Sequence, residues 1–160
     1  MLEIFNNLEP FFEENYRDLG VREYARLVKI SPPTASKILG HFKKEGLLLC
    51  QEERRYLLYR ANRENKVLIE LSKAFWLVKL KDLAEYLKEE FNYTKIILFG
   101  SLVKLEATKN SDIDLYLNTL EKEVNLKKFE KILNRKIQLH FKASFKNPSL
   151  KKNIGQGVGL

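Results

Sequence analysis

Two short apolar runs, at 96–99 and 115–117, flank a polar segment in the second half of the chain. Runs of this length bounded by glycine or polar residues are typical of buried strands. Side chains alternate between the two faces of a strand, so Asp112 and Asp114 are expected to share one face. The intervening Ile113 then points into the core. The pattern predicts two strands with a pair of carboxylates at the start of the second.

A third strand is predicted at 135–142, where apolar and polar residues alternate. Ile137, Leu139 and Phe141 fall on one face, and Gln138, His140 and Lys142 fall on the other. A charged helix is predicted before it at 121–133, with Val124, Leu126, Phe129, Ile132 and Leu133 facing inward.

Helical spacing also organises the first half of the chain. Tyr24, Ala25, Leu27 and Val28 form the stripe of a short helix, and Ala35, Ile38, Leu39 and Phe42 form that of a second. Ser31 is a suitable N-cap for the second helix and Pro32 suits its first position. Gly46 is expected to end it, and two strands at 47–51 and 56–60 follow around a polar turn at 52–55.

A helical connector is predicted between these halves, with a break near 79–81. Its apolar positions at helical spacing are Val67, Leu68, Leu71, Phe75, Val78, Leu83, Leu87 and Phe91. No glycine or proline lies between Gly46 and Gly100, which favours a stiff connection. Trp76 is expected to pack against a neighbouring domain or subunit rather than against a nucleotide.

The residues between the two central strands have the chemistry of a phosphate and metal site. Gly100 has no side chain to obstruct a phosphate, and Ser101 adds a hydroxyl and backbone N–H groups that can bind one. Asp112 and Asp114 can share a divalent cation, and Mg²⁺ prefers such oxygen ligands. The alternative is an ordinary surface turn with two solvated aspartates.

The segment GSLVKLEATKNSDID resembles the signature of the DNA polymerase beta-type nucleotidyltransferase superfamily. The resemblance implies transfer of a nucleoside monophosphate from a nucleoside triphosphate, with ATP expected, to a hydroxyl acceptor. It assigns Asp112 and Asp114 to catalysis and to Mg²⁺ or Mn²⁺, and Gly100, Ser101 and Ser111 to the nucleotide. Lys104, Lys109 and Lys136 are further candidates for contact with the triphosphate.

The third carboxylate of that family is missing here. Gln138 occupies the position expected for it, and a neutral amide should weaken catalysis more than nucleotide binding. His140 is either a substitute metal ligand or a packed strand histidine. The expected enzyme is therefore impaired, and a nucleotide-sensing domain without chemistry is the alternative.

Residues 1–65 resemble a winged helix-turn-helix domain of bacterial and archaeal transcription regulators. The resemblance implies contact with the major groove of duplex DNA by the second helix and with phosphate by the turn of the hairpin. The residues that it implicates are Pro33, Thr34, Ser36, Lys37, Arg54 and Arg55. Use of the domain for protein contacts is the alternative, and Glu52 and Glu53 oppose DNA binding.

The formal net charge is +8, distributed mainly over two basic blocks. Residues 20–65 contain ten basic and five acidic residues, and residues 92–160 contain thirteen and six. Such blocks indicate either polyanion binding or a lysine-rich solvated surface. The single cysteine, Cys50, excludes a disulfide framework. The chain has no run long enough to span a membrane and no basic leader, so a cytoplasmic protein is expected.

Together these patterns predict an α/β (α+β) protein with an N-terminal winged helix-turn-helix domain at 1–65, a helical connector at 66–91 and a minimal mixed-sheet nucleotidyltransferase core at 92–160. The functional alternatives are an enzyme, a DNA-binding transcriptional regulator with an impaired nucleotide-sensing domain, and an antitoxin that modifies a partner toxin. A homodimer is expected by analogy with winged-helix regulators. The glycines at 155–157 are expected to form a flexible tail over the site or a frayed terminus.

Overall fold

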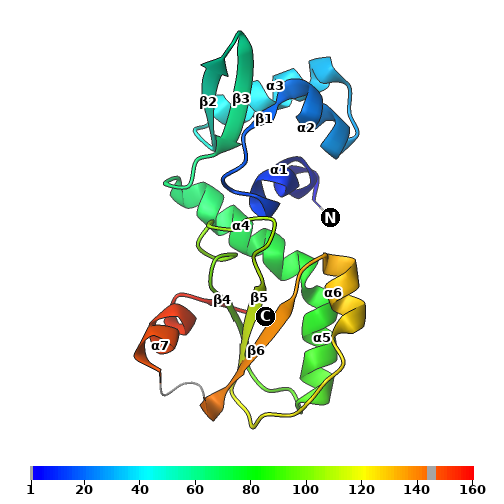
Figure 1. Cartoon of the computed structure of the whole chain (residues 1–160), viewed down its shortest axis with the longest axis vertical. Helices are drawn as coiled ribbons and strands as arrows, with labels where there is room; N and C mark the ends of the chain where they lie inside the picture. Colours follow the sequence, from blue (N-terminus) through cyan, green and yellow to red (C-terminus); the bar gives the residue numbers. More distant parts are fainter. Residues whose placement is uncertain (1, 144–146) are drawn as a thin grey trace. The chain divides into compact units, whose positions relative to one another are not determined.

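The computed structural model describes residues 2–143 and 147–160, which form seven helices and two sheets (Figure 1). This mixture of helices and sheets is consistent with the predicted α/β class. The chain divides into two compact units, one formed by Met1–Phe75 with Leu105–Lys109 and the other by Trp76–Lys104 with Asn110–Leu160. The domain boundaries at 65 and 91 stay a prediction. Within the described ranges, no helix has the length and apolar composition needed to cross a bilayer.

The first unit begins with a helix that the pattern analysis missed, α1 (Glu3–Glu13). Its apolar residues recur at helical spacing, and Phe5, Leu8, Phe11 and Phe12 are buried. Pro10 makes a helix difficult to predict here, because proline inside a helix removes a hydrogen bond and usually ends the helix. Here the packing of the aromatic stripe outweighs that cost, since α1 continues to Glu13.

The two predicted helices are present as α2 (Val21–Val28) and α3 (Pro32–Lys44). The Thr34 backbone N–H donates to the Ser31 hydroxyl at 3.4 Å, and Pro32 takes the first helical position, as predicted. Ala35, Leu39 and Phe42 are buried, and Ile38 is half-buried. Gly46 follows the helix at a φ of 73°, the left-handed conformation that lets glycine end a helix.

The sheet of the first unit has the strand order β1-β3-β2 and is antiparallel throughout. Its strands are β1 (Leu19–Gly20), β2 (Leu48–Glu53) and β3 (Tyr56–Ala61). The four-residue turn expected at 52–55 is wrong, because Glu52 and Glu53 pair with Leu57 and Tyr56 within the hairpin. The turn consists of Arg54 and Arg55 alone.

Both turn arginines adopt left-handed backbone conformations, with φ of 50° at Arg54 and 68° at Arg55. A two-residue hairpin turn of this kind normally contains Asn-Gly, because other L-residues pay about 1–2 kcal/mol each in that conformation. We expect Arg54→Asn with Arg55→Gly to raise the free energy of unfolding by about 1 kcal/mol, after glycine's extra chain entropy is subtracted. Urea denaturation measures this change. The matched pair Arg54→Lys with Arg55→Lys should change nothing, and a destabilised Asn-Gly variant would contradict the assignment of strain.

Part of the spacer between Ser101 and Asp112 belongs to the first unit. Leu105 and Ala107 are fully buried there. The Asn15 backbone N–H donates to the Ala107 carbonyl at 2.9 Å, and the Ala107 N–H donates to the Asn15 side-chain oxygen. The Arg63 side chain donates to the Leu105 carbonyl at 2.9 Å. The spacer is therefore held by specific hydrogen bonds at its middle rather than forming a free surface loop.

The connector is two helices, α4 (Lys66–Lys79) and α5 (Lys81–Glu90), with the break at the predicted position. The sheet of the second unit consists of β4 (Ile96–Phe99), β5 (Ile113–Leu117), β6 (Ile137–Phe141) and β7 (Val158–Gly159). Its strand order is β6-β5-β4-β7 (Figure 1). The β5–β6 pair is parallel, while β4 pairs antiparallel with β5 and β7. This is the mixed sheet expected for the C-terminal core.

Two sequence predictions about this unit are wrong. The helix expected at 121–133 is only α6 (Lys127–Leu133), and Ile132 is 68% exposed rather than inward. The C-terminal glycine segment is neither a flexible tail nor a frayed end, because helix α7 (Pro148–Gly155) and strand β7 occupy it. Gly157 permits this packing, since a Cβ there would lie 2.5 Å from both an Ile97 methyl carbon and the Leu98 carbonyl oxygen.

Candidate active site

The two aspartates lie at the start of β5, where the sheet fixes which way they point. Ile113 is fully buried, so the flanking Asp112 and Asp114 face the other side of the sheet, where both are half-buried. Asp114 is in register with Phe99 on β4 and with Gln138 on β6. The predicted alternation of this strand is confirmed, and it puts two carboxylates and Gln138 on one face.

Gly100 follows β4 directly and faces the Asp114 carboxylate. Its φ is +82°, and a Cβ at this position would lie 2.5 Å from Asp114 Oδ2. Both the backbone conformation and the close approach therefore require glycine. Ser101 follows in a turn and is half-buried. The Gly-Ser pair and the second aspartate, fourteen positions apart in the sequence, are thus adjacent in space.

A buried arginine that the sequence analysis did not single out supports the first aspartate. Arg135 is 7% exposed, and its Nη1 donates to the Ser111 carbonyl at 2.6 Å. Its guanidinium carbon lies 5.5 Å from the centre of the ring of Trp76, which is fully buried and belongs to the same unit. A buried arginine needs strong acceptors. One such acceptor is the backbone immediately before Asp112, so Arg135 positions the start of β5.

Gln138 and His140 each approach one aspartate. The Gln138 amide Nε2 donates to Asp112 Oδ2 at 2.5 Å, and His140 Nε2 lies 3.4 Å from Asp114 Oδ1. His140 also packs edge-on against Phe99, with ring centres 5.1 Å apart. It is half-buried, so it is both a packed strand residue and a polar neighbour of Asp114.

Burial raises the pKa of the Asp114 carboxyl above the usual aspartate value. The hydrogen bond and the charge of His140 act in the opposite direction, and the neighbouring Asp112 carboxylate adds to the increase. Ionisation of Asp114 therefore costs free energy in the folded chain. A bound cation would offset this cost, because it would stabilise the carboxylate.

This raised pKa predicts a pH dependence of stability. The folded chain binds the Asp114 proton more tightly than the unfolded chain does, so the contribution of Asp114 to stability is fully present below the unfolded pKa and is lost as pH rises through the raised pKa. Asp114→Asn removes the charge, and we expect the variant to be more stable than the natural chain at neutral pH. The difference should shrink as pH falls below the pKa of an unfolded aspartate. Urea denaturation across this pH range measures it, and a difference that grows toward low pH would contradict the assignment.

The donor set fits a magnesium ion that is completed by substrate. In the part of the chain that the structure describes, no three His, Cys, Asp or Glu side chains form a cluster suited to a metal. Mg²⁺ does not need such a cage, because it is commonly bound by one or two carboxylates together with water and nucleotide phosphates. Asp112 and Asp114 on one face supply that pair.

Of the lysines proposed for the triphosphate, one has a defined position. The Lys104 ammonium donates to Asn153 Oδ1 at 2.7 Å, which joins the turn after Ser101 to helix α7. Lys136 is exposed immediately before β6, and Lys109 is exposed in the first unit.

The residues proposed for DNA contact belong to the first unit. Pro33, Thr34, Ser36 and Lys37 are exposed near the start of α3, and the Thr34 hydroxyl lies 2.8 Å from the Ser31 hydroxyl. Arg54 and Arg55 are exposed at the hairpin turn. A basic surface that the sequence analysis missed adds Arg22 and Arg26 on α2 and Lys29 directly after it. These three residues line a pocket with Pro32 at the start of α3. The signal was present as three basic residues spaced three or four apart.

Comparison with known proteins identifies a nucleotidyltransferase domain in the second half of the chain. The family model described as "Nucleotidyltransferase domain" matches residues 80–156. The chain is 36% identical over 78 residues to the protein of Methanocaldococcus jannaschii named "Putative protein adenylyltransferase MJ0128". The match covers 45% of this chain and 80% of that protein. A second protein of that organism, named "Putative protein adenylyltransferase MJ1379", is 34% identical over 80 residues with the same coverage of each chain.

Proposed function

Because this chain belongs to the nucleotidyltransferase family, we propose that it binds a nucleoside triphosphate and Mg²⁺, or Mn²⁺, at Asp112 and Asp114 and transfers a nucleoside monophosphate to a hydroxyl group. ATP is the proposed donor, in keeping with the names of the relatives. One observation carries the proposal: Gly100 adopts a conformation and a contact with Asp114 that only glycine allows. Such a constraint is expected where a phosphate and a carboxylate must approach the same backbone.

In this mechanism each residue has a limited task. Gly100 leaves room for a phosphate beside Asp114, and Ser101 and Ser111 offer polar groups to the nucleotide. Asp112 and Asp114 would hold the cation, which would supply positive charge to neutralise the phosphates. The acceptor oxygen forms a bond to the α-phosphorus, the bond to the bridging oxygen breaks, and pyrophosphate leaves. The acceptor loses its hydroxyl proton to solvent or to a nearby carboxylate.

The position of Gln138 makes the reaction slow rather than absent. Its amide lies against Asp112 at 2.5 Å and contributes no negative charge. A third carboxylate would help to hold a cation at the attacking hydroxyl. Without it, nucleotide binding depends on the two aspartates and should persist, while turnover falls by about a hundredfold or more. The acceptor hydroxyl could belong to a protein, including a partner toxin, to a nucleic acid or to a small molecule.

Incubation with radiolabelled ATP and Mg²⁺ tests the transferase function. The natural chain should bind the nucleotide and transfer label slowly to itself or to an added acceptor, and Asp114→Ala should do neither. Identical behaviour of the two proteins in both binding and transfer would refute the proposal. Binding without transfer would instead favour the nucleotide-sensing alternative.

A second function, binding of duplex DNA by the first unit, is supported by a different observation. Exposed basic residues lie on α2, near the start of α3 and at the strained hairpin turn. Strained backbone at an exposed turn is more often retained for function than for stability. We propose that this unit is a winged helix-turn-helix domain, that its α3 enters the major groove, and that Arg54 and Arg55 contact phosphate.

A salt-dependent gel shift with duplex DNA tests this second function. Lys37→Ala with Arg55→Ala should weaken binding, and loss of the Arg55 phosphate contact should reduce the slope of log affinity against log salt by about 1. The matched pair Lys127→Ala with Lys131→Ala, on exposed positions of α6, should have no effect. If both pairs behave like the natural chain, the first unit is a protein-interaction module.

A further inference from the structure

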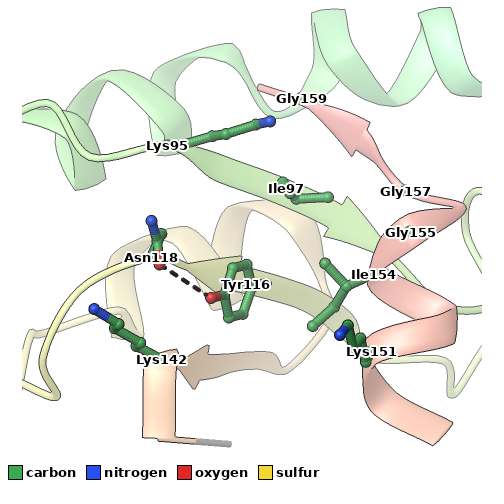
Figure 2. A pocket seen from close by; sticks show the side chains of 10 residues that line it. All are labelled: Lys95, Ile97, Tyr116, Asn118, Lys142, Lys151, Ile154, Gly155, Gly157 and Gly159. Atoms are coloured by element: carbon green, nitrogen blue, oxygen red, sulfur yellow. Dashed lines mark hydrogen bonds between the residues drawn. The ribbon is translucent and has the colours of Figure 1, made fainter. Parts of the chain in front are cut away.

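A pocket of about 820 Å³ lies on the sheet of the second unit, outside the residues assigned to catalysis (Figure 2). Its floor is apolar and is formed by Ile97, Tyr116 and Ile154, of which Tyr116 and Ile154 are only 5% exposed. The backbones of Gly155, Gly157 and Gly159 line one side. Gly157 has no room for a side chain, so β7 approaches β4 closely at this edge. The volume is large enough for a small-molecule ligand.

Three lysines from separate elements surround this floor. Lys95 precedes β4, Lys142 follows β6 and Lys151 is on α7, and all three are exposed. Backbone hydrogen bonds fix two of these positions, because the Asn118 N–H donates to the Lys95 carbonyl at 3.3 Å and the Lys142 N–H donates to the Thr119 carbonyl at 3.2 Å. No carboxylate is among the described residues that line the pocket. The pocket therefore attracts an anion.

The pocket also offers neutral hydrogen-bonding groups beside its floor. The Tyr116 hydroxyl donates to Asn118 Oδ1 at 3.2 Å, and the Asn118 amide nitrogen points away from Tyr116 (Figure 2). That nitrogen can donate to a ligand, while the Tyr116 ring and Ile97 present an apolar surface. A flat ring with polar edges, carrying a phosphate, matches these three kinds of contact.

The pocket and the aspartates share one face of the sheet. Tyr116 follows Asp114 by two residues on β5 and is in register with Ile97 and His140. Two residues along a strand span about 7 Å. The distance from a ligand on this floor to the proposed site of transfer is therefore no longer than one nucleotide.

We propose that this pocket binds a nucleoside 5′-phosphate unit, and that this unit belongs to the acceptor of the transfer reaction. The inference rests on the proposed nucleotidyltransferase function. It narrows the acceptor from any hydroxyl group to a free hydroxyl of a nucleoside that carries a 5′-phosphate. The unit comes either from a free nucleotide or from the 3′ end of a nucleic acid strand, and each of these carries a free 3′-hydroxyl. In both cases an acceptor hydroxyl attacks the α-phosphorus of the donor and pyrophosphate leaves.

Calorimetric titration of the full chain with AMP tests the pocket separately from catalysis. AMP should bind in EDTA, since no metal is required, and should bind with the same affinity when a non-hydrolysable ATP analogue and Mg²⁺ are present. Lys142→Gln with Lys151→Gln should weaken AMP binding at least about tenfold, because two charge-assisted contacts to phosphate are lost. The matched pair Lys131→Gln with Lys152→Gln, which removes the same charge outside the pocket, should leave it unchanged.

The possible results separate the two proposals. If the ATP analogue does not bind, while AMP binds and its binding depends on Lys142 and Lys151, the acceptor pocket is supported and the proposed donor site is refuted. If AMP competes with the analogue, or binds equally well to both pairs of variants, the acceptor pocket is refuted while the donor site stands. An oligonucleotide with a free 3′-hydroxyl that binds more tightly than AMP identifies the 3′ end of a strand as the source, and the reverse order identifies a free nucleotide. Label transfer to a protein hydroxyl at a rate unaffected by Lys142→Gln with Lys151→Gln would also refute the acceptor assignment.

Discussion

Replacement of Gln138 by aspartate should raise the rate of nucleotidyl transfer by about a hundredfold. Gln138 is in register with Asp114 and donates to Asp112 at 2.5 Å, so a carboxylate there would face the same volume as the two aspartates. Supplying a missing charge-stabilising group at a reacting centre is worth about two to three orders of magnitude. Single-turnover transfer of label from ATP to AMP, at saturating Mg²⁺, measures the change.

The same substitution should make stability depend on the cation. Three carboxylates on one face repel one another when no cation is present, whereas the natural amide relieves Asp112 through its hydrogen bond. We therefore expect Gln138→Asp to lower the Tm in EDTA and to give a larger Mg²⁺-induced increase in Tm than the natural chain. Gln138→Asn is the matched control, because it shortens the side chain without adding charge. If Asp and Asn variants have equal rates and equal responses to Mg²⁺, Gln138 does not occupy the position of a catalytic carboxylate.

Replacement of Gly100 by alanine should weaken nucleotide binding strongly and reduce transfer by about a hundredfold or more. The backbone at Gly100 has a φ of +82°, and the new Cβ would lie 2.5 Å from Asp114 Oδ2. Alanine in this conformation costs about 1–2 kcal/mol, and the contact must also displace the carboxylate. A displacement of about 1 Å at a reacting centre is enough to cost two orders of magnitude.

Gly40 provides the control for this substitution. It lies inside α3, and a Cβ there would meet no atom within 4 Å apart from its chain neighbours and the backbone of the helix itself. Gly40→Ala should therefore leave nucleotide binding unchanged and increase stability by about 0.5–1 kcal/mol, because alanine favours the helix. Titration with the ATP analogue and urea denaturation measure the two effects. Equal nucleotide affinity in Gly100→Ala and Gly40→Ala would show that the Gly100 contact has no part in the site.

The central features of the candidate site could be predicted because they depend on short-range patterns. Alternation along β5 places Asp112 and Asp114 together whatever surrounds the strand, and the same rule assigns Gln138 and His140 to one face of β6. The Ser31 cap and the break between α4 and α5 follow from local signals as well. In each case the determining residues lie within a few positions of one another.

Other features depend on contacts between residues that lie far apart in the sequence, and no local pattern indicates these contacts. The Arg135 side chain binds the Ser111 carbonyl across 24 positions, and nothing local identifies its acceptor. Asn15 holds Ala107 across 92 positions, so the spacer's attachment to the first unit could not be inferred from the spacer itself. The C-terminal glycines suggested a mobile tail, but the close approach of Gly157 to Ile97 and Leu98 makes glycine a packing requirement there. The hairpin is longer than the polar run at 52–55 predicts, and a two-residue turn at Arg54 and Arg55 is not indicated by the sequence, because arginine is a poor residue for left-handed backbone.

The most direct measurement is the Mg²⁺ dependence of nucleotide affinity in the natural chain and in Asp112→Asn with Asp114→Asn. Calorimetry with a non-hydrolysable ATP analogue should detect binding with Mg²⁺ and at least tenfold weaker binding in EDTA. The double variant should bind weakly in both conditions, and thermal unfolding should confirm that it remains folded. Affinity that is the same with and without Mg²⁺, and the same in the natural chain and the double variant, would contradict a nucleotide and metal site at these two aspartates.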